Sequence, residues 1–168
     1  MFCNSVIPGG THADGLTYNA LIVLPDGVYL ELIAFVHADP PPSRSHHRWG
    51  KATSPGWIDF AHLGLTAVDD DDEDDGTTSG VINGRAAKEG SGVAYLAEVN
   101  GGRETPQGRT IRWRVTAPEA KHGIGRLPFF CGDVTPREWR VRNFYFYFYF
   151  IIITFSKKCV KKKKLTLR

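Results

Sequence analysis

A hairpin near the start of the chain constrains the fold most strongly. Residues 16–24 and 28–36 are both rich in strand formers, and a Pro-Asp-Gly turn at 25–27 separates them. In the second predicted strand both faces are apolar apart from Glu31. A strand with two apolar faces is covered on both sides, so we expect residues 28–36 to be central in a sheet and Glu31 to be buried there.

The remaining patterns predict an α+β domain over residues 1–142. Ser54-Pro55 is typical of a helix start, and we expect a short helix from Gly56 to about Gly64. Further predicted strands cover 93–99, 110–116 and 127–131, with turns at 101–103 and 106–108.

An acidic insertion interrupts this domain. Residues 69–75 are all Asp or Glu, and a stretch rich in Gly, Ser and Thr continues to Ser91. Because this segment has few apolar residues, we expect 69–91 to be a mobile, solvated insertion. A calcium loop is the alternative, but an EF-hand needs acids at alternate positions, a central Gly and a terminal Glu, and the run lacks that spacing.

The charge distribution argues against a nucleic-acid partner. The formal net charge is +3, yet six lysines and one arginine follow Asn143 with no acid among them. Without those seven, 14 basic residues stand against 18 acidic ones, and no clustered basic face is left.

The cysteines and the first ten residues bear on location. Cys3, Cys131 and Cys159 are too widely spaced for a zinc knuckle or a disulfide framework. Residues 1–10 have no basic start and no apolar run, so we expect no secretory signal. Both observations favour a cytoplasmic protein.

Residues 143–168 form a low-complexity tail. Alternating Phe and Tyr lead into three isoleucines and then the lysines. About 12 apolar residues fall short of the ~20 that a transmembrane helix needs, so we expect no transmembrane span. A short membrane anchor beside the lysines is one interpretation. We favour another, in which translated non-coding DNA gives this pattern and the tail is not part of the fold.

Several blocks resemble the glyoxalase-like domain family of the vicinal-oxygen-chelate superfamily, in particular its fungal-type members. They are 8–17 with Asn19, 26–35, 55–61, 101–103 and 127–137, in that order. The resemblance covers about residues 8–141. It implies paired βαβββ modules that form a curled mixed sheet around a half-barrel cleft. It also implies a truncated fold, incomplete at both ends, because the first strand and the last strands of relatives have no counterpart here.

The resemblance also implies a chemistry. In many relatives one divalent metal, held by His and Glu, chelates two substrate oxygens and stabilises their developing negative charge. Glu31 matches a ligand position and is the candidate catalytic residue. As a buried carboxylate it also needs a positive partner, either a metal or an arginine such as Arg112 or Arg114. His12 is a second candidate ligand.

Three further residues are candidate substrate contacts: Asp14, Asn19 and Trp57. For Asp14 a turn is the alternative, in which its side chain bonds nearby backbone. Cys131, in an apolar strand, is interpreted as a packed thiol.

Three functions remain open. The first is metal-dependent lyase, isomerase or dioxygenase chemistry on a small oxygenated metabolite. A catalytic metal normally has about three protein ligands, but the relatives' first-strand His is absent and Gly132 stands where they have His. This favours impaired activity. The second is a metal-free small-molecule-binding module, and the third is a non-functional gene-model fragment. A homodimer is also open, since a second chain often completes paired half-barrels.

Overall fold

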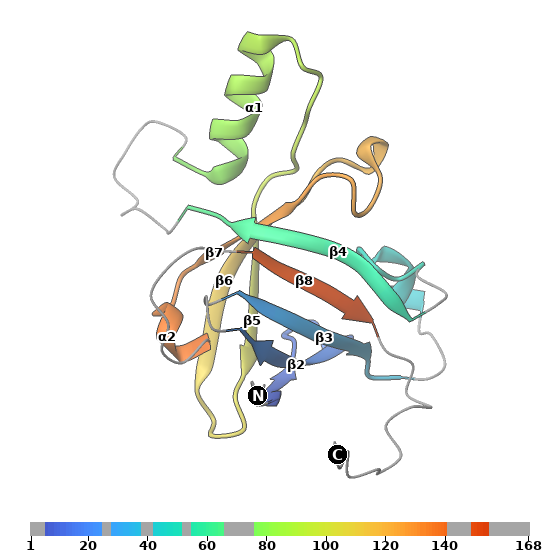
Figure 1. Ribbon diagram of the computed structural model, residues 1–168, viewed down its shortest axis with the longest axis vertical. Coiled ribbons are helices and arrows are strands. Elements are labelled where there is room, and N and C mark those ends of the chain that lie inside the picture. Colours follow the sequence, from blue (N-terminus) through green and yellow to red (C-terminus); the bar gives the residue numbers. More distant parts are fainter. Residues whose placement is uncertain are drawn as a thin grey trace.

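The computed structural model describes residues 6–24, 28–37, 42–51, 55–65, 76–140 and 149–154. Its strands form one mixed sheet in the order β1-β2-β3-β8-β4-β7-β6-β5 (Figure 1). The strands are β1 (Val6–Thr11), β2 (Thr17–Val23), β3 (Tyr29–Phe35), β4 (Gly56–Leu63), β5 (Val99–Glu104), β6 (Thr110–Thr116), β7 (Phe129–Asp133) and β8 (Tyr149–Thr154). The helices are α1 (Thr78–Glu89), α2 (Arg137–Arg140) and two short 3-10 helices, η1 (Pro42–His46) and η2 (Ala120–His122). The predicted α+β class is confirmed.

The predicted hairpin and its central strand are confirmed. β2 and β3 pair antiparallel from Thr17 opposite Phe35 to Val23 opposite Tyr29. The turn residues 25–27 lie outside the described residues. β3 also pairs with β8 on its other edge, so it has a neighbour on both sides.

The sheet consists of two halves with the same strand arrangement. In one half, β4, α1, β5, β6 and β7 follow one another as a βαβββ unit in which β4 is parallel to β7. In the other half, β8 is parallel to β3, and β2 and β1 follow outward. The halves join where β8 pairs antiparallel with β4. This is the paired-module arrangement that the resemblance implied.

Six residues of the tail belong to the sheet, contrary to our expectation. Tyr149–Thr154 form β8, which lies between β3 and β4 at the join of the two halves. Aromatic and β-branched residues suit a strand with neighbours on both edges. β8 has the position in its half that β4 has in the other. The rest of the tail lies outside the described residues.

The helix predicted from Gly56 is wrong, because these residues form β4. Trp57, Ile58 and Phe60 are strand-forming types, and β4 pairs with β7 on one edge and β8 on the other. This non-local pairing outweighs the local Ser-Pro signal. The irregularity between Trp57 and Asp59 is a change of register against β8.

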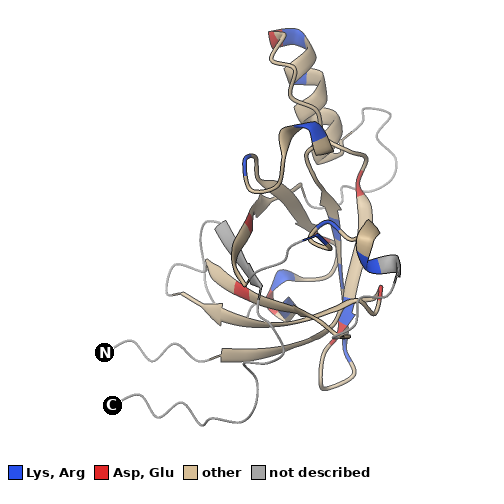
Figure 2. Cartoon of the chain, turned by 90° about the vertical axis from the view of Figure 1, so that its right-hand side faces the viewer, with Lys and Arg blue, Asp and Glu red and all other residues tan. Residues whose placement is uncertain are grey.

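The expected mobile insertion is wrong for its second half, which contains helix α1. Thr77 caps the helix by accepting a hydrogen bond from the Gly80 N–H at 3.0 Å, and Gly90 ends it in a left-handed conformation. Capping residues therefore fix both ends of α1, and the helix projects from the sheet in Figures 1 and 2. Residues 69–75 lie outside the described residues. No described helix is long and apolar enough to cross a membrane.

The strand expected at 93–99 lies later in the chain. β5 begins at Val99 and includes the Gly101-Gly102-Arg103 segment that we took for a turn. Gly101 pairs with Trp113 of β6, and a Cβ at Gly101 would overlap the Trp113 indole. These glycines therefore allow close strand approach and do not mark a turn. The strand 110–116 is confirmed as β6, and the strand 127–131 is found at Phe129–Asp133 as β7.

Candidate functional site

A cavity of about 450 Å³ lies between the two halves of the sheet. The edge strands β1 and β5 approach each other there. His12 and Arg103 form an isolated antiparallel β-bridge, and the Ala13 N–H donates to the Gly102 carbonyl at 2.8 Å. Figure 2 shows the curl of the sheet from the side. The cavity surface is mainly apolar, and its polar lining includes His12, Asn19, Glu31, Arg103 and Arg140.

Asn19 of β2 is held in one orientation. The Gly10 N–H donates to Asn19 Oδ1 at 3.1 Å, and a backbone N–H can only donate, so this atom is the amide oxygen. The amide nitrogen Nδ2 therefore donates to Glu31 Oε1 at 2.7 Å and faces His12 Nε2 at 3.3 Å. A Cβ at Gly9 would overlap the Asn19 side chain, so this glycine makes the close approach possible.

His12 is a neutral imidazole with a defined tautomer. Because Asn19 Nδ2 donates, His12 Nε2 accepts, and the ring proton lies on Nδ1, which donates to Thr17 Oγ1 at 2.6 Å. Burial lowers the pKa of His12, and the charges of Glu31 and Asp14 only partly oppose this effect. The site therefore presents a neutral nitrogen acceptor beside a carboxylate.

Glu31 of β3 is buried, as the sequence predicted, with 8% of its surface exposed. The arginine whose charge faces it is Arg103 of β5, since burial lowers the pKa of Arg103 and Glu31 opposes that shift. Arg112 and Arg114, our expected partners, do not line the cavity. The β5–β6 register explains the difference, because Arg103 pairs with buried Ile111 and shares its face, whereas Arg112 and Arg114 point to the other face.

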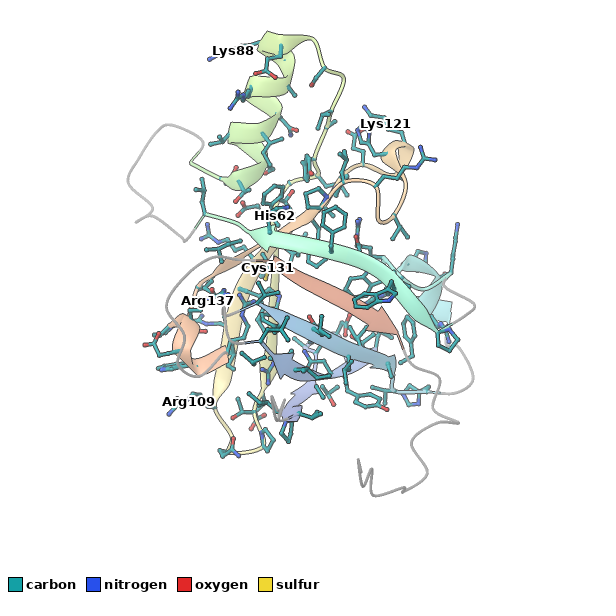
Figure 3. The ribbon with its side chains drawn as sticks, viewed as in Figure 1. His62, Lys88, Arg109, Lys121, Cys131 and Arg137 are labelled. Atoms are coloured by element: carbon teal, nitrogen blue, oxygen red, sulfur yellow. The ribbon has the colours of Figure 1, made fainter. Side chains whose placement is uncertain are left out.

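Sequence reasoning missed Arg140, which lines the same cavity from α2. Its Nη2 lies 2.6 Å from Asp133 Oδ1, and its Nη1 donates to Cys131 Sγ at 2.9 Å. Cys131 is 3% exposed, and burial raises the pKa of its thiol, as expected of a packed thiol. No local sequence pattern marks Arg140, because its place depends on a four-residue helix and on its contacts with Asp133 and Cys131. Figure 3 labels Cys131 among the strands and Arg137 on α2.

The comparison with protein families decides the identity of the fold. Residues 4–143 match the family model of the glyoxalase-like domain. The chain belongs to this family. The match ends before β8, so the glyoxalase-like domain of this chain is completed by a strand from outside the matched region.

This glyoxalase-like domain also resembles a solved structure. It is similar to the crystal structure of a hypothetical protein from Staphylococcus aureus, with a TM-score of 0.57 and 12% sequence identity. The alignment covers 92% of this chain and 79% of the other. At this identity the likeness shows the fold alone. No curated protein matches the chain.

Among the described residues, the cavity offers fewer ligands than a catalytic metal of the kind that the resemblance implied usually has. His12 Nε2 and Glu31 Oε1 lie 3.7 Å apart, so the two candidate ligands are brought together. Among the described residues, however, no group of three His, Cys, Asp or Glu side chains is placed to hold a metal ion. A catalytic metal usually has about three protein ligands. Asn19 also directs amide hydrogens at both candidate ligand atoms.

Of the three predicted substrate contacts, two line the cavity and one does not. Asn19 and Asp14 line the cavity, and Asp14 Oδ1 also accepts a hydrogen bond from the Leu16 N–H at 2.9 Å, as the turn interpretation predicted. Trp57 lies on β4 with 64% of its surface exposed and does not line the cavity. The substrate contact predicted for Trp57 stays a prediction.

Proposed function

We propose that this glyoxalase-like domain binds a small, oxygen-containing organic molecule in the cavity, without a metal ion. The observation that carries the proposal is the interlocked cluster of His12, Asn19 and Glu31 on a mainly apolar surface. Ligand sites are typically cavities of roughly 300–1,000 Å³ with apolar walls and few polar groups. The volume of about 450 Å³ falls within this range.

The cluster supports recognition of a ligand hydroxyl or carbonyl group. The contact between Asn19 Nδ2 and His12 Nε2, at 3.3 Å, is longer than that between Nδ2 and Glu31 at 2.7 Å. A ligand hydroxyl that donates to Nε2 therefore competes with the weaker of the two contacts. The neutral imidazole is also the state that can accept a proton from a bound molecule.

A thermal-shift screen tests this function on the full chain. The probes are 2-hydroxy acids, diols, phenols and primary alcohols, each with excess EDTA, and hits are confirmed by calorimetry. We expect at least one class to bind in EDTA and Asn19→Leu to weaken that binding about tenfold or more, equivalent to ~1.4 kcal/mol. Trp57→Leu, outside the cavity, serves as the control. Binding that requires added metal contradicts the proposal.

Metal-dependent chemistry on a small oxygenated metabolite is the second candidate, because His12 and Glu31 lie 3.7 Å apart. Metal binding by these residues stays a prediction. Elemental analysis of the purified protein, before and after incubation with Zn²⁺, Mn²⁺ or Fe²⁺, measures it. Stoichiometric metal that Glu31→Gln abolishes would favour this candidate over the metal-free one.

A further inference from the structure

Arg140 is a buried cation whose donors are incompletely used. It is 7% exposed and lies in the cavity lining together with Cys131. Asp133 Oδ1 lies 2.6 Å from Nη2, and Cys131 Sγ accepts from Nη1. In the part of the chain that the structure describes, neither Nε nor Nη2 makes a hydrogen bond, and both atoms are buried. A guanidinium carries five N–H donors, and a buried donor without an acceptor is costly.

The neighbours of Arg140 compensate its charge only in part. Asp133 is shared, since its Oδ2 also accepts from Arg137 Nη1 at 3.0 Å. The thiol of Cys131 is a weak acceptor, and burial raises its pKa, so it supplies no negative charge near neutral pH. Burial likewise raises the pKa of Tyr29, whose phenol therefore stays neutral beside Arg140.

The carboxylates of the cavity lining are engaged elsewhere. Glu31 accepts from Asn19 and faces the charge of Arg103. Asp14, whose side chain is about half exposed, accepts a hydrogen bond from the Leu16 N–H through Oδ1, and its Oδ2 lies 3.9 Å from His47 Nε2. These are the acidic residues of the described lining, so the only acid beside Arg140 among the described residues is Asp133, which Arg137 shares.

We infer that the Arg140 end of the cavity binds a carboxylate group, so that the ligand is a small organic monocarboxylate. This inference rests on the proposed function and specifies its ligand class. A planar guanidinium with an unused Nε–H suits a carboxylate, which accepts through two oxygens. A single partly compensated guanidinium matches one negative charge better than two.

Trp113 connects this end of the cavity to the polar cluster. The Arg140 guanidinium lies 5.7 Å from the Trp113 ring centroid, and the His12 ring meets the same indole edge-on at 5.8 Å. A ligand whose carboxylate binds Arg140 can therefore lay its carbon skeleton along Trp113 toward His12. The apolar walls, which include Phe129 and Val115, favour an aliphatic or aromatic skeleton.

Matched acid and amide pairs test the inference on the full chain. Calorimetry in EDTA compares acetate, benzoate, phenylacetate and 3-phenylpropanoate with their amides, and inorganic phosphate is a separate arm. We expect at least one acid to bind tenfold or more tightly than its amide. Equal affinities within every pair, or phosphate binding more tightly than any acid, overturns the inference but leaves the proposed function intact.

Failure of every acid and amide to bind also overturns the inference. In that case alcohols or phenols that bind in the same assay keep the proposed function, and their failure removes it too.

Two variants locate the carboxylate. Arg140→Gln should abolish the preference for the acid over the amide, whereas Arg109→Gln should retain it. The guanidinium carbon of Arg109 lies 4.7 Å from the centroid of the Trp139 ring. Figure 3 labels Arg109 at the β5–β6 hairpin, apart from Cys131. If Arg140→Gln unfolds, Arg140→Lys keeps the charge without the planar fork, and we expect an intermediate preference. A full preference in a folded Arg140→Gln protein contradicts the assignment.

Discussion

At the residue scale, Asn19 holds the polar cluster together. One amide satisfies the Gly10 N–H, the Glu31 carboxylate and the His12 ring, so its orientation follows from the bonding capacity of its partners. The buried Glu31 thereby has a neutral donor in addition to the charge of Arg103. This explains how a carboxylate is kept in a mainly apolar cavity.

Asn19→Ala should lower the free energy of unfolding by about 1–3 kcal/mol, because the variant leaves a buried carboxylate without its short hydrogen bond. Urea denaturation followed by circular dichroism measures the change. Gln107→Ala, at an exposed position of the β5–β6 turn, is the control and should stay within about 0.5 kcal/mol of the parent. Equal effects of the two variants would contradict the role of Asn19.

The lowered pKa of His12 gives a pH dependence of stability. In the unfolded chain His12 titrates near its ordinary value of 6.5, and in the folded chain burial keeps it neutral to lower pH. The unfolded state therefore binds more protons between these two values, so stability is complete above pH 6.5 and falls as the pH is lowered below it.

His12→Gln should accordingly lose less stability between pH 7.5 and 5.5 than the parent does. Burial also lowers the pKa of His47 and of His62, so the parallel variant His62→Gln, with a far less buried ring, serves as the comparison. Denaturation midpoints at the two pH values are compared within each protein. An unchanged slope in His12→Gln would show that this ring does not titrate as described.

At the scale of helices and strands, elements whose partners are adjacent in sequence could be predicted, whereas elements whose partners are distant in sequence could not. The β2–β3 hairpin was predictable, because its turn and both its strands are adjacent in sequence. The residues of β4 carry a local helix-start signal, but their conformation is decided by pairing with β7 and β8, which lie far away in the chain. Local sequence reasoning has no access to such partners.

The same distinction applies to the candidate site. Glu31 was predictable because a single acid interrupts two apolar faces of one strand. Arg103 was not, because the Gly-Gly pair before it is typical of a turn, and only the fit of Gly101 against Trp113 makes this segment a strand. Arg140 reaches the cavity from a four-residue helix whose placement depends on its contacts with Asp133 and Cys131.

Two glycine variants test this packing. Gly101→Ala should cost about 1–3 kcal/mol of unfolding free energy, because the added Cβ overlaps the Trp113 indole. Gly84→Ala, in the middle of α1 with no atom near the added Cβ, should instead be neutral or stabilising by up to about 1 kcal/mol. Chemical denaturation of both proteins measures the difference. A Gly101→Ala protein as stable as Gly84→Ala would contradict the close β5–β6 fit.

At the scale of the whole molecule, the sheet depends on a strand from the C-terminal tail. β8 pairs with β3 through five residue positions and with β4 along most of its length, so it joins the two halves. Its removal would leave the facing edges of β3 and β4 without a partner strand. The region that matches the glyoxalase-like family, residues 4–143, therefore does not contain the whole sheet of this chain.

A chain ending at Arg142 should lose cooperative unfolding or become insoluble, because β3 and β4 are then separated. A chain ending at Val160 retains β8 and should unfold cooperatively. Thermal melts followed by circular dichroism compare the two. A chain ending at Arg142 that melts like the full protein would show that β8 is dispensable.

The tryptophans provide the most direct test of the central claim, that the cavity binds a small molecule without a metal. Trp49 and Trp113 line the cavity, whereas Trp57 and Trp139 do not. Indole N–H signals in a proton–nitrogen NMR spectrum, assigned with single Trp→Phe variants, are followed while a ligand is titrated in EDTA. We expect the Trp49 and Trp113 signals to shift with saturation while those of Trp57 and Trp139 stay in place. Shifts confined to Trp57 and Trp139, or shifts of Trp49 and Trp113 only after metal is restored, would contradict the claim.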